Sequence, residues 1–210
     1  MDDDEIKRSV LKWRKASPAI VELWGGQWRK HPDKWEFSHE LYGLEGMAIK
    51  AVLNPNTWTQ YRDAMFLCYN DVLYLRLPSG RCIAYHRPRL VESVDRFSQN
   101  SIYSLSYEGW NSNPKKGGYG WLRMDTYGGE LCNNFIQGAC ADVFRQGMLN
   151  VEAAGYPIVL HTHDELISEV PVGYGSIEEY EQLMMTPAPW CAHWPLKASG
   201  GWRGKMYRKE

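Results

Sequence analysis

This sequence lacks a run of about 18 consecutive apolar residues, the length that a membrane-spanning helix needs, so we expect no membrane association. No secretory apolar segment follows Met1. The five cysteines are odd in number and scattered, without a CxxC pair, which favours reduced thiols and predicts a cytoplasmic protein. The formal net charge of −1 excludes a dominant basic field, so any nucleic-acid surface must be local.

The composition that is present is typical of a folded protein, with 44% hydrophobic and 23% charged residues. A chain of 210 residues can bury one good core, as one domain or two small ones. The sequence is rich in aromatics, with 10 Trp and 13 Tyr. Most of them are expected to be half-buried packing residues, and a few are candidates for stacking on bases.

The first part of the chain is expected to be helical. Apolar residues recur at helical spacing over residues 4–24, and Pro18 is expected to break that helix after Ser17. Residues 25–42 are rich in Trp, Gly, Lys and His without a clean period, which predicts an irregular insertion. A second helix is predicted over residues 44–52, before the turn residues that follow it.

The middle of the chain alternates between apolar and polar residues, which predicts antiparallel strands over 65–69, 72–77, 82–85 and 101–107. A proline turn beginning at Pro78 is expected to join the second and third of these strands, with Arg81 emerging from it. A loop is expected over residues 110–120. Arg81 and Arg123 lie beside turn or strand ends, which suits phosphate contact, although a solvated surface arginine is an equally good interpretation.

The last part of the chain combines helices with a hairpin, which makes the expected fold class α+β. The longest predicted helix runs from Glu130 to Ala154, with Asn133 and Gln137 on one face. A hairpin is expected over residues 157–170. A final helix over residues 176–185 begins with a Ser and carries a Glu three positions later, the pattern of a capping box.

The expected hairpin places Asp164 and Glu165 side by side at its bend. Two adjacent carboxylates repel each other and are poorly solvated near apolar strands, so a divalent cation would neutralise them well. Ordinary turn chemistry is the alternative interpretation for Asp164. His161 and His163 also form an HxH pair whose spacing zinc can use, but the sequence supplies no evident third or fourth ligand.

Several motifs follow one another in an order that resembles a known family. They are Leu77-Pro78-Ser79-Gly80-Arg81, Thr126-Tyr127-Gly128-Gly129-Glu130-Leu131, the helix with Asn133, Asn134 and Gln137, His163-Asp164-Glu165, and the terminal Trp202-Arg203-Gly204-Lys205-Met206-Tyr207. This order resembles the C-terminal part of family A DNA polymerases, the polymerase I-like enzymes, and most closely their phage-encoded members. Residues 13–24 resemble a helix of the fingers, and residues 25–42 match least.

The resemblance implies a palm-type antiparallel hairpin or sheet packed on helices. It assigns residues 1–75 to a fingers-derived helical part with an insertion and residues 76–210 to the C-terminal palm part. It also implies template-directed DNA synthesis in the cytoplasm, which is the host cytoplasm if a phage encodes the chain.

The resemblance further implies roles for individual residues. Asp164, assisted by Glu165, would ligate catalytic Mg²⁺, and His163 would contact the primer terminus. The remaining implied DNA contacts are Asn133 or Asn134, between which the sequence does not choose, together with Gln137, Arg81 and Arg123.

Two parts of the family pattern do not occur in this sequence: the first-motif carboxylate and the nucleotide-binding helix. Two-metal phosphoryl transfer needs carboxylates that bridge both ions, and one hairpin cannot supply both sides. We therefore expect a fragment that binds primer-template DNA and dNTP and shares its two-metal site with an N-terminal polymerase half. The alternatives are a stand-alone metal-dependent nuclease and a catalytically silent DNA-binding remnant.

Overall fold

The computed structural model describes residues 3–30, 35–94, 101–112 and 117–206. The chain divides into two compact units, Met1–Gln137 and Gly138–Glu210, which are described separately. One helix, α4 (Gly128–Ala153), begins in the first unit and continues into the second. The division expected at residues 75 and 76 concerns the family origin of the segments, and it stays a prediction.

The first unit opens with two helices, α1 (Asp3–Ala16) and α2 (Pro18–Trp24), and the expected break at Ser17 is confirmed. Proline is well suited to the first position of α2, because the N–H that it lacks would have no partner within the helix. The rings of Trp13 and Trp24 stack with their centroids 5.4 Å apart, so the two helices contact each other.

A hairpin follows where an irregular insertion was expected, and that prediction is wrong. Strands β1 (Gly26–Lys30) and β2 (Trp35–Tyr42) pair antiparallel, with a register shift near Gly26. A two-stranded ribbon is held by hydrogen bonds between backbones, which leave little trace in the hydrophobic period that sequence analysis reads. Helix α3 (Gly43–Leu53) comes next and confirms the second predicted helix.

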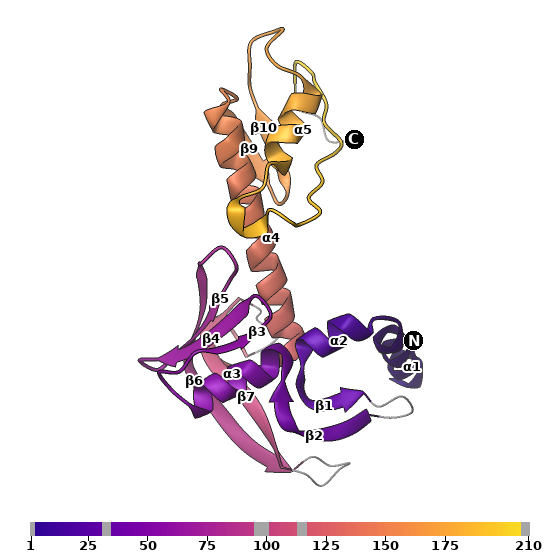
Figure 1. Cartoon of the computed structure of the whole chain (residues 1–210), viewed down its shortest axis with the longest axis vertical. Coiled ribbons are helices and arrows are strands. Elements are labelled where there is room, and N and C mark those ends of the chain that lie inside the picture. The colour runs from indigo at the N-terminus through magenta and orange to yellow at the C-terminus, as the bar shows by residue number, and fades with distance from the viewer. Residues whose placement is uncertain (1–2, 31–34, 95–100, 113–116, 207–210) are drawn as a thin grey trace. The chain divides into compact units, whose positions relative to one another are not determined.

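A six-stranded antiparallel sheet follows in the first unit, before the first turns of α4 (Figure 1). Each strand pairs with the next along the chain: β3 (Thr59–Tyr61), β4 (Ala64–Tyr69), β5 (Val72–Arg76), β6 (Cys82–Val94), β7 (Ser101–Asn111) and β8 (Gly120–Thr126). The expected turn joins β5 to β6, where the Gly80 N–H donates to the Leu77 carbonyl at 2.9 Å. Strand β6 is longer than expected, and β3 and β8 were not expected.

The core of the first unit lies where one face of the sheet meets α3 and the start of α4. Strands contribute Phe66 and Leu75, α3 contributes Leu44, and α4 contributes Leu131, and all four are 0% exposed. Full burial of such a side chain stabilises the fold by about 1.5–3 kcal/mol. This packing fixes the first turns of α4 against the sheet.

The second unit contains the rest of α4, the hairpin of β9 (Ile158–Thr162) and β10 (Glu165–Ser168), helix α5 (Ile177–Met185) and a 3-10 turn at Pro189–Cys191. Gly155, with φ of 84°, follows the end of α4. The predicted cap is confirmed, because Ser176 Oγ accepts a hydrogen bond from the Glu179 N–H at 3.0 Å. The α+β class is confirmed as well.

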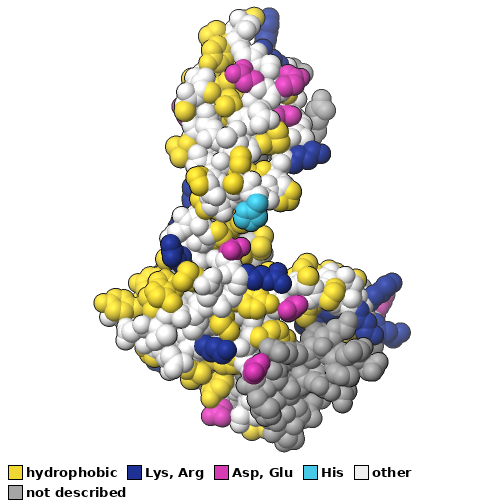
Figure 2. All heavy atoms as spheres, in the orientation of Figure 1, with side chains coloured by type: hydrophobic (Ala, Val, Ile, Leu, Met, Phe, Trp, Pro, Cys, Tyr) yellow, Lys and Arg dark blue, Asp and Glu magenta, His cyan; other side chains and the backbone are white. Residues whose placement is uncertain are grey.

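Among the helices of the described ranges, none is both long and apolar enough to cross a bilayer. Lys and Arg side chains are interspersed with Asp and Glu over the face seen in Figure 2. This distribution accords with the near-neutral net charge of −1.

Candidate functional site

The acidic bend of the second unit is a two-residue turn. Thr162 pairs with Glu165, which leaves only His163 and Asp164 between the strands. Asp164 is therefore at the bend as predicted and is exposed, whereas Glu165 is half-buried and begins β10. The expectation that both acids occupy the bend is corrected, because a two-residue loop has no place for a third residue. His163 has a positive φ of 53°, a conformation in which histidine is enriched among non-glycine residues.

Side-chain contacts anchor the hairpin within the second unit. The rings of His161 and Phe144 of α4 lie with their centroids 6.4 Å apart. The Ile158 N–H donates to Glu152 Oε1 at 2.6 Å, so a carboxylate of α4 also binds the beginning of β9. Both contacts are made by β9, and Asp164 is exposed at the bend that follows this strand.

The donor chemistry of Asp164 and Glu165 fits magnesium. Carboxylate oxygens are the ligands that Mg²⁺ prefers, and this ion often needs only one or two of them besides water and substrate phosphates. Within the part of the chain that the structure describes, no three His, Cys, Asp or Glu side chains cluster as a complete metal site. The zinc alternative therefore gains no third ligand for His161 and His163 among those residues, and the magnesium site stays a prediction.

The structure distinguishes the two asparagines between which the sequence did not choose. Asn133 is exposed on α4, where its Oδ1 accepts a hydrogen bond from Gln137 Nε2 at 3.2 Å. Asn134 is half-buried, and its Nδ2 donates to the Tyr85 hydroxyl at 3.0 Å. Burial raises the pKa of Tyr85 to about 12, so this hydroxyl is neutral at physiological pH. Asn133 and Gln137 thus form the accessible amide pair, while Asn134 joins α4 to the sheet.

Arg81 lies directly after the turn that joins β5 to β6, as predicted, and is exposed. Its backbone N–H donates to Ser79 Oγ at 3.4 Å, and its carbonyl accepts from the Leu77 N–H at 2.8 Å. The backbone N–H and the carbonyl of Arg81 therefore both stabilise the turn. The phosphate contact of Arg81 stays a prediction.

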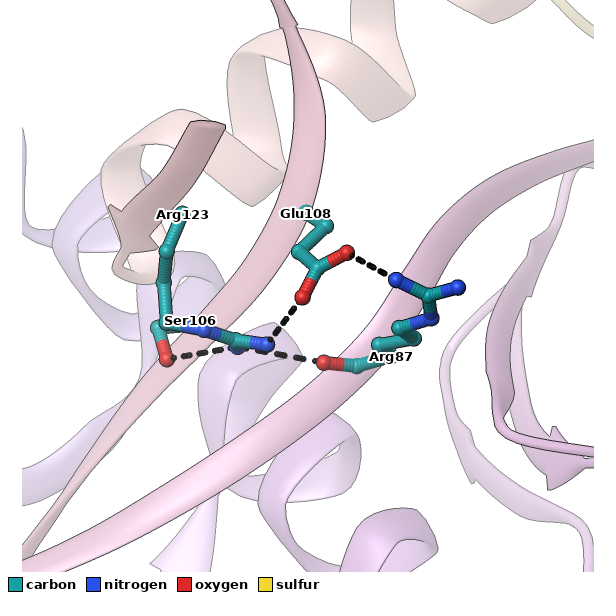
Figure 3. Close-up of polar contacts among 4 residues, drawn as sticks. All are labelled: Arg87, Ser106, Glu108 and Arg123. Carbon is teal, nitrogen blue, oxygen red and sulfur yellow. Dashed lines mark hydrogen bonds and ion pairs between the residues drawn. The ribbon is translucent and has the colours of Figure 1, made fainter. Parts of the chain in front are cut away.

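Arg123 belongs to a polar network across three strands that sequence reasoning missed (Figure 3). Its guanidinium contacts Glu108 Oε1 at 3.0 Å, Ser106 Oγ at 3.3 Å and the Arg87 carbonyl at 3.1 Å. Arg87 binds the other oxygen of Glu108 at 2.7 Å. The hydrogen bond from Arg87, followed by that from Arg123, holds the pKa of the Glu108 carboxyl below its usual range. A phosphate contact by Arg123 stays a prediction.

One signal of this network was present in the sequence. Pro88 lies within β6, and a proline within a strand indicates a bulge or an edge strand. The register confirms a bulge, since His86 pairs with Glu108 while Arg89 pairs with Ser106. One extra residue is therefore inserted on β6, and Arg87 adopts a positive φ of 48° there.

The comparison with curated proteins matches this chain to the "DNA polymerase" of Bacillus phage SP02, with 32% identity over 198 residues. This chain is similar to part of a phage DNA polymerase. The similarity covers 94% of the chain but 26% of the phage protein, so the chain spans about a quarter of the length of this curated relative. No family model matches, and no solved structure matches. The polymerase relationship is thus confirmed, whereas family A, the C-terminal position and the palm-type fold stay predictions.

Proposed function

We propose that this chain carries out template-directed DNA synthesis as the C-terminal part or subunit of a family A DNA polymerase. The observation that carries the proposal is the similarity to the phage DNA polymerase over 94% of the chain. The motif order described above and the exposed acid at the β9–β10 bend support it. In this proposal the protein acts in the cytoplasm of the host cell.

In this proposal Asp164 ligates catalytic Mg²⁺ and Glu165 assists it. Asp164 is exposed at the turn, and Glu165 follows at the first position of β10. The carboxylate oxygens of both residues therefore belong to one short hairpin. When bound, Mg²⁺ would activate the primer 3′-hydroxyl and neutralise the triphosphate of the incoming nucleotide. His163, the other bend residue, would contact the primer terminus.

The amide pair of Asn133 and Gln137 would contact the minor groove of the primer-template. Hydrogen-bond acceptors in that groove are nearly equivalent for all base pairs, so amides can sense correct pairing without reading sequence. The exposure of both amides supports this role, and it favours Asn133 over the half-buried Asn134. Arg81 and Arg123 would contact phosphates, which position DNA without specifying its sequence.

A second polypeptide segment would complete the site. It would supply the first-motif carboxylate, which shares the two-metal site, and the helix that binds the incoming dNTP. The partners are accordingly primer-template DNA, dNTP and an N-terminal polymerase half. The coverage of about a quarter of the phage relative is compatible with such a half.

The test measures Mg²⁺-dependent dNTP incorporation on a primer-template by the chain mixed with the product of the reading frame that precedes it. We expect incorporation only from the mixture. Asp164→Asn should lower the rate by at least about a hundredfold, because a metal ligand supplies several kcal/mol of transition-state stabilisation. Asp63→Asn is the matched control, since Asp63 is also an exposed acid in a turn between two strands, and it should leave the rate unchanged.

Two outcomes would contradict the proposal as a whole, and a third would contradict the role of Asp164. Degradation of DNA by the isolated chain, abolished by Asp164→Asn, would identify a stand-alone nuclease. Tight DNA binding without synthesis in any mixture would identify a catalytically silent remnant. Equal incorporation by the wild type and the Asp164→Asn variant would remove the metal role of that residue.

A further inference from the structure

The outer face of strands β6, β7 and β8 carries two large exposed aromatic side chains. Trp110 of β7 and Trp121 of β8 pair directly across the two strands, so their side chains lie on the same face. They are 62% and 59% exposed. Neighbouring positions on the opposite face, such as Tyr85 and Leu105, are buried in the core. The two exposed tryptophans therefore lie on the face of the sheet away from the core and do not contribute to core packing.

A third ring extends this aromatic row. His86 of β6 is exposed, and its ring meets Trp121 edge-on, with centroids 5.7 Å apart and planes at 80°. Three successive strands therefore each present a ring on the same side of the sheet. Strands lie about 4.8 Å apart, so the row offers adjacent π-faces at the scale of neighbouring bases in a single strand.

The bulge in β6 adds positive charge beside the rings. In a regular strand Arg87 would point to the face opposite His86, because side chains alternate. The extra residue and the positive φ of 48° instead bring the Arg87 guanidinium to Glu108, the direct cross-strand partner of His86. A backbone conformation that is unfavourable for arginine is thus used to place a cation on the aromatic face.

The charges on this face are mainly positive. By the same register Arg89 and Arg123 lie on it, the bulge brings Arg87 to it, and Arg76 lies on the same side of the neighbouring β5, against two acids, Glu108 and Asp125. Both oxygens of Glu108 are already occupied by Arg87 and Arg123. A phosphate backbone has the charge that complements this excess.

We propose that this aromatic face of β6–β8 binds single-stranded DNA, with bases stacked on Trp110 and Trp121 and phosphates beside the arginines. Unpaired bases expose π-faces that a duplex conceals, so the exposed rings favour a single strand. The choice of DNA over RNA rests on the proposed function, because a polymerase handles the unpaired template strand. The stacking surface itself depends only on residues of this sheet.

The experiment measures the anisotropy of labelled oligo(dT), oligo(rU) and duplex DNA with the full chain. We expect oligo(dT) to bind more tightly than either of the other two. The double variant Trp110→Ala/Trp121→Ala should weaken binding by about tenfold or more for each ring, as for loss of a stacked base. Trp110→Phe/Trp121→Phe keeps the stacking rings and should retain most of the affinity.

Two further variants separate stacking from charge. Trp58→Ala, which removes a 45% exposed tryptophan outside β6–β8, is the matched control and should bind as the wild type does. Arg89→Gln should reduce the slope of log affinity against log salt by about 0.7, the value for one phosphate contact to a single strand. Circular dichroism and the thermal midpoint establish that each variant is folded.

The proposal is overturned if the folded double alanine variant binds oligo(dT) as well as the wild type does. Preference for duplex or for oligo(rU) would also overturn it. A dimer that becomes monomeric in the double alanine variant, with unchanged oligo(dT) affinity, would assign the face to a second copy of the chain. Since binding is measured without partner or synthesis, failure of this proposal is distinguishable from failure of the polymerase assignment.

Discussion

Glu45 and Gly128 are joined by a hydrogen bond in which the Gly128 N–H donates to Glu45 Oε2 at 3.0 Å. The bond connects the first turn of α3 to the first residue of α4. Burial raises the pKa of the Glu45 carboxyl, and the hydrogen bond from Gly128 opposes that shift only in part. A half-buried carboxylate therefore holds the beginning of the helix that carries Asn133 and Gln137.

Glu45→Gln should reduce the pH dependence of stability. Because the pKa of Glu45 is raised in the folded state, the folded chain binds more protons than the unfolded chain between the ordinary value of 4.5 and that raised value. The wild type should thus lose stability as pH rises through this window, whereas a glutamine keeps an acceptor for Gly128 and does not titrate. Urea unfolding at a series of pH values measures the effect. Glu92→Gln, at an exposed glutamate, should leave the wild-type profile intact, and an identical profile for Glu45→Gln would contradict the prediction.

Gly128→Ala should destabilise the first unit by about 1–3 kcal/mol, the usual cost of forced overpacking. A Cβ at this position would collide with the backbone carbonyl of Trp24, which ends α2 and cannot move aside as a flexible side chain would. Urea unfolding measures the free energy. A variant as stable as the wild type would show that α4 does not need this close approach to α2.

Tyr85→Phe should cost about 1–3 kcal/mol of stability, because it leaves the half-buried Asn134 amide without its acceptor. The matched control is Tyr119→Phe, since Tyr119 is 72% exposed and its hydroxyl is accessible to water. Combining Tyr85→Phe with Asn134→Leu should cost less than the sum of the single variants, as expected for a contacting pair. Additive costs would mean that the two side chains act independently.

Ser176→Ala should destabilise the second unit by about 1 kcal/mol, because it removes the side-chain acceptor at the beginning of α5. Ser176→Asp should retain the cap, since aspartate is an equally good residue at this position. Hydrogen exchange at the Glu179 amide reports the change locally. Unchanged protection of that amide in the alanine variant would contradict the prediction.

Gln137→Ala should lower dNTP incorporation by the reconstituted polymerase about tenfold, as for loss of one DNA hydrogen bond in the transition state. Gln137 is exposed, so its removal should leave the thermal midpoint near that of the wild type. Single-turnover incorporation measures the rate. Gln146→Ala, at another glutamine of α4, serves as the comparison and should leave the rate unchanged.

Much of the helical structure followed from local signals. Pro18 separates α1 from α2, Gly155 follows α4, and Ser176 caps α5, all as predicted. Each of these signals acts through a few neighbouring residues, because Pro, Gly and Ser change backbone preferences within one turn. The bend at Asp164 was recognised for the same reason.

The strands β1, β2, β3 and β8 and the length of β6 were not foreseen. These elements depend on pairing between segments, and in β6 on a bulge that lets the strand continue past Pro88. The network of Arg87, Glu108 and Arg123 was missed for the same reason, since its members meet only through cross-strand register.

The sequence by itself determined the positions of the main helices, the acidic bend and the resemblance to a DNA polymerase, because helical period, turn chemistry and motif order are all written along the chain. Only the tertiary structure decided that Asn134 binds Tyr85 while Asn133 stays accessible with Gln137. It also decided that Arg123 binds Glu108 and that Trp110 and Trp121 share an exposed face. These relationships join residues distant in sequence, and their physical basis is strand register and burial, which no local pattern encodes.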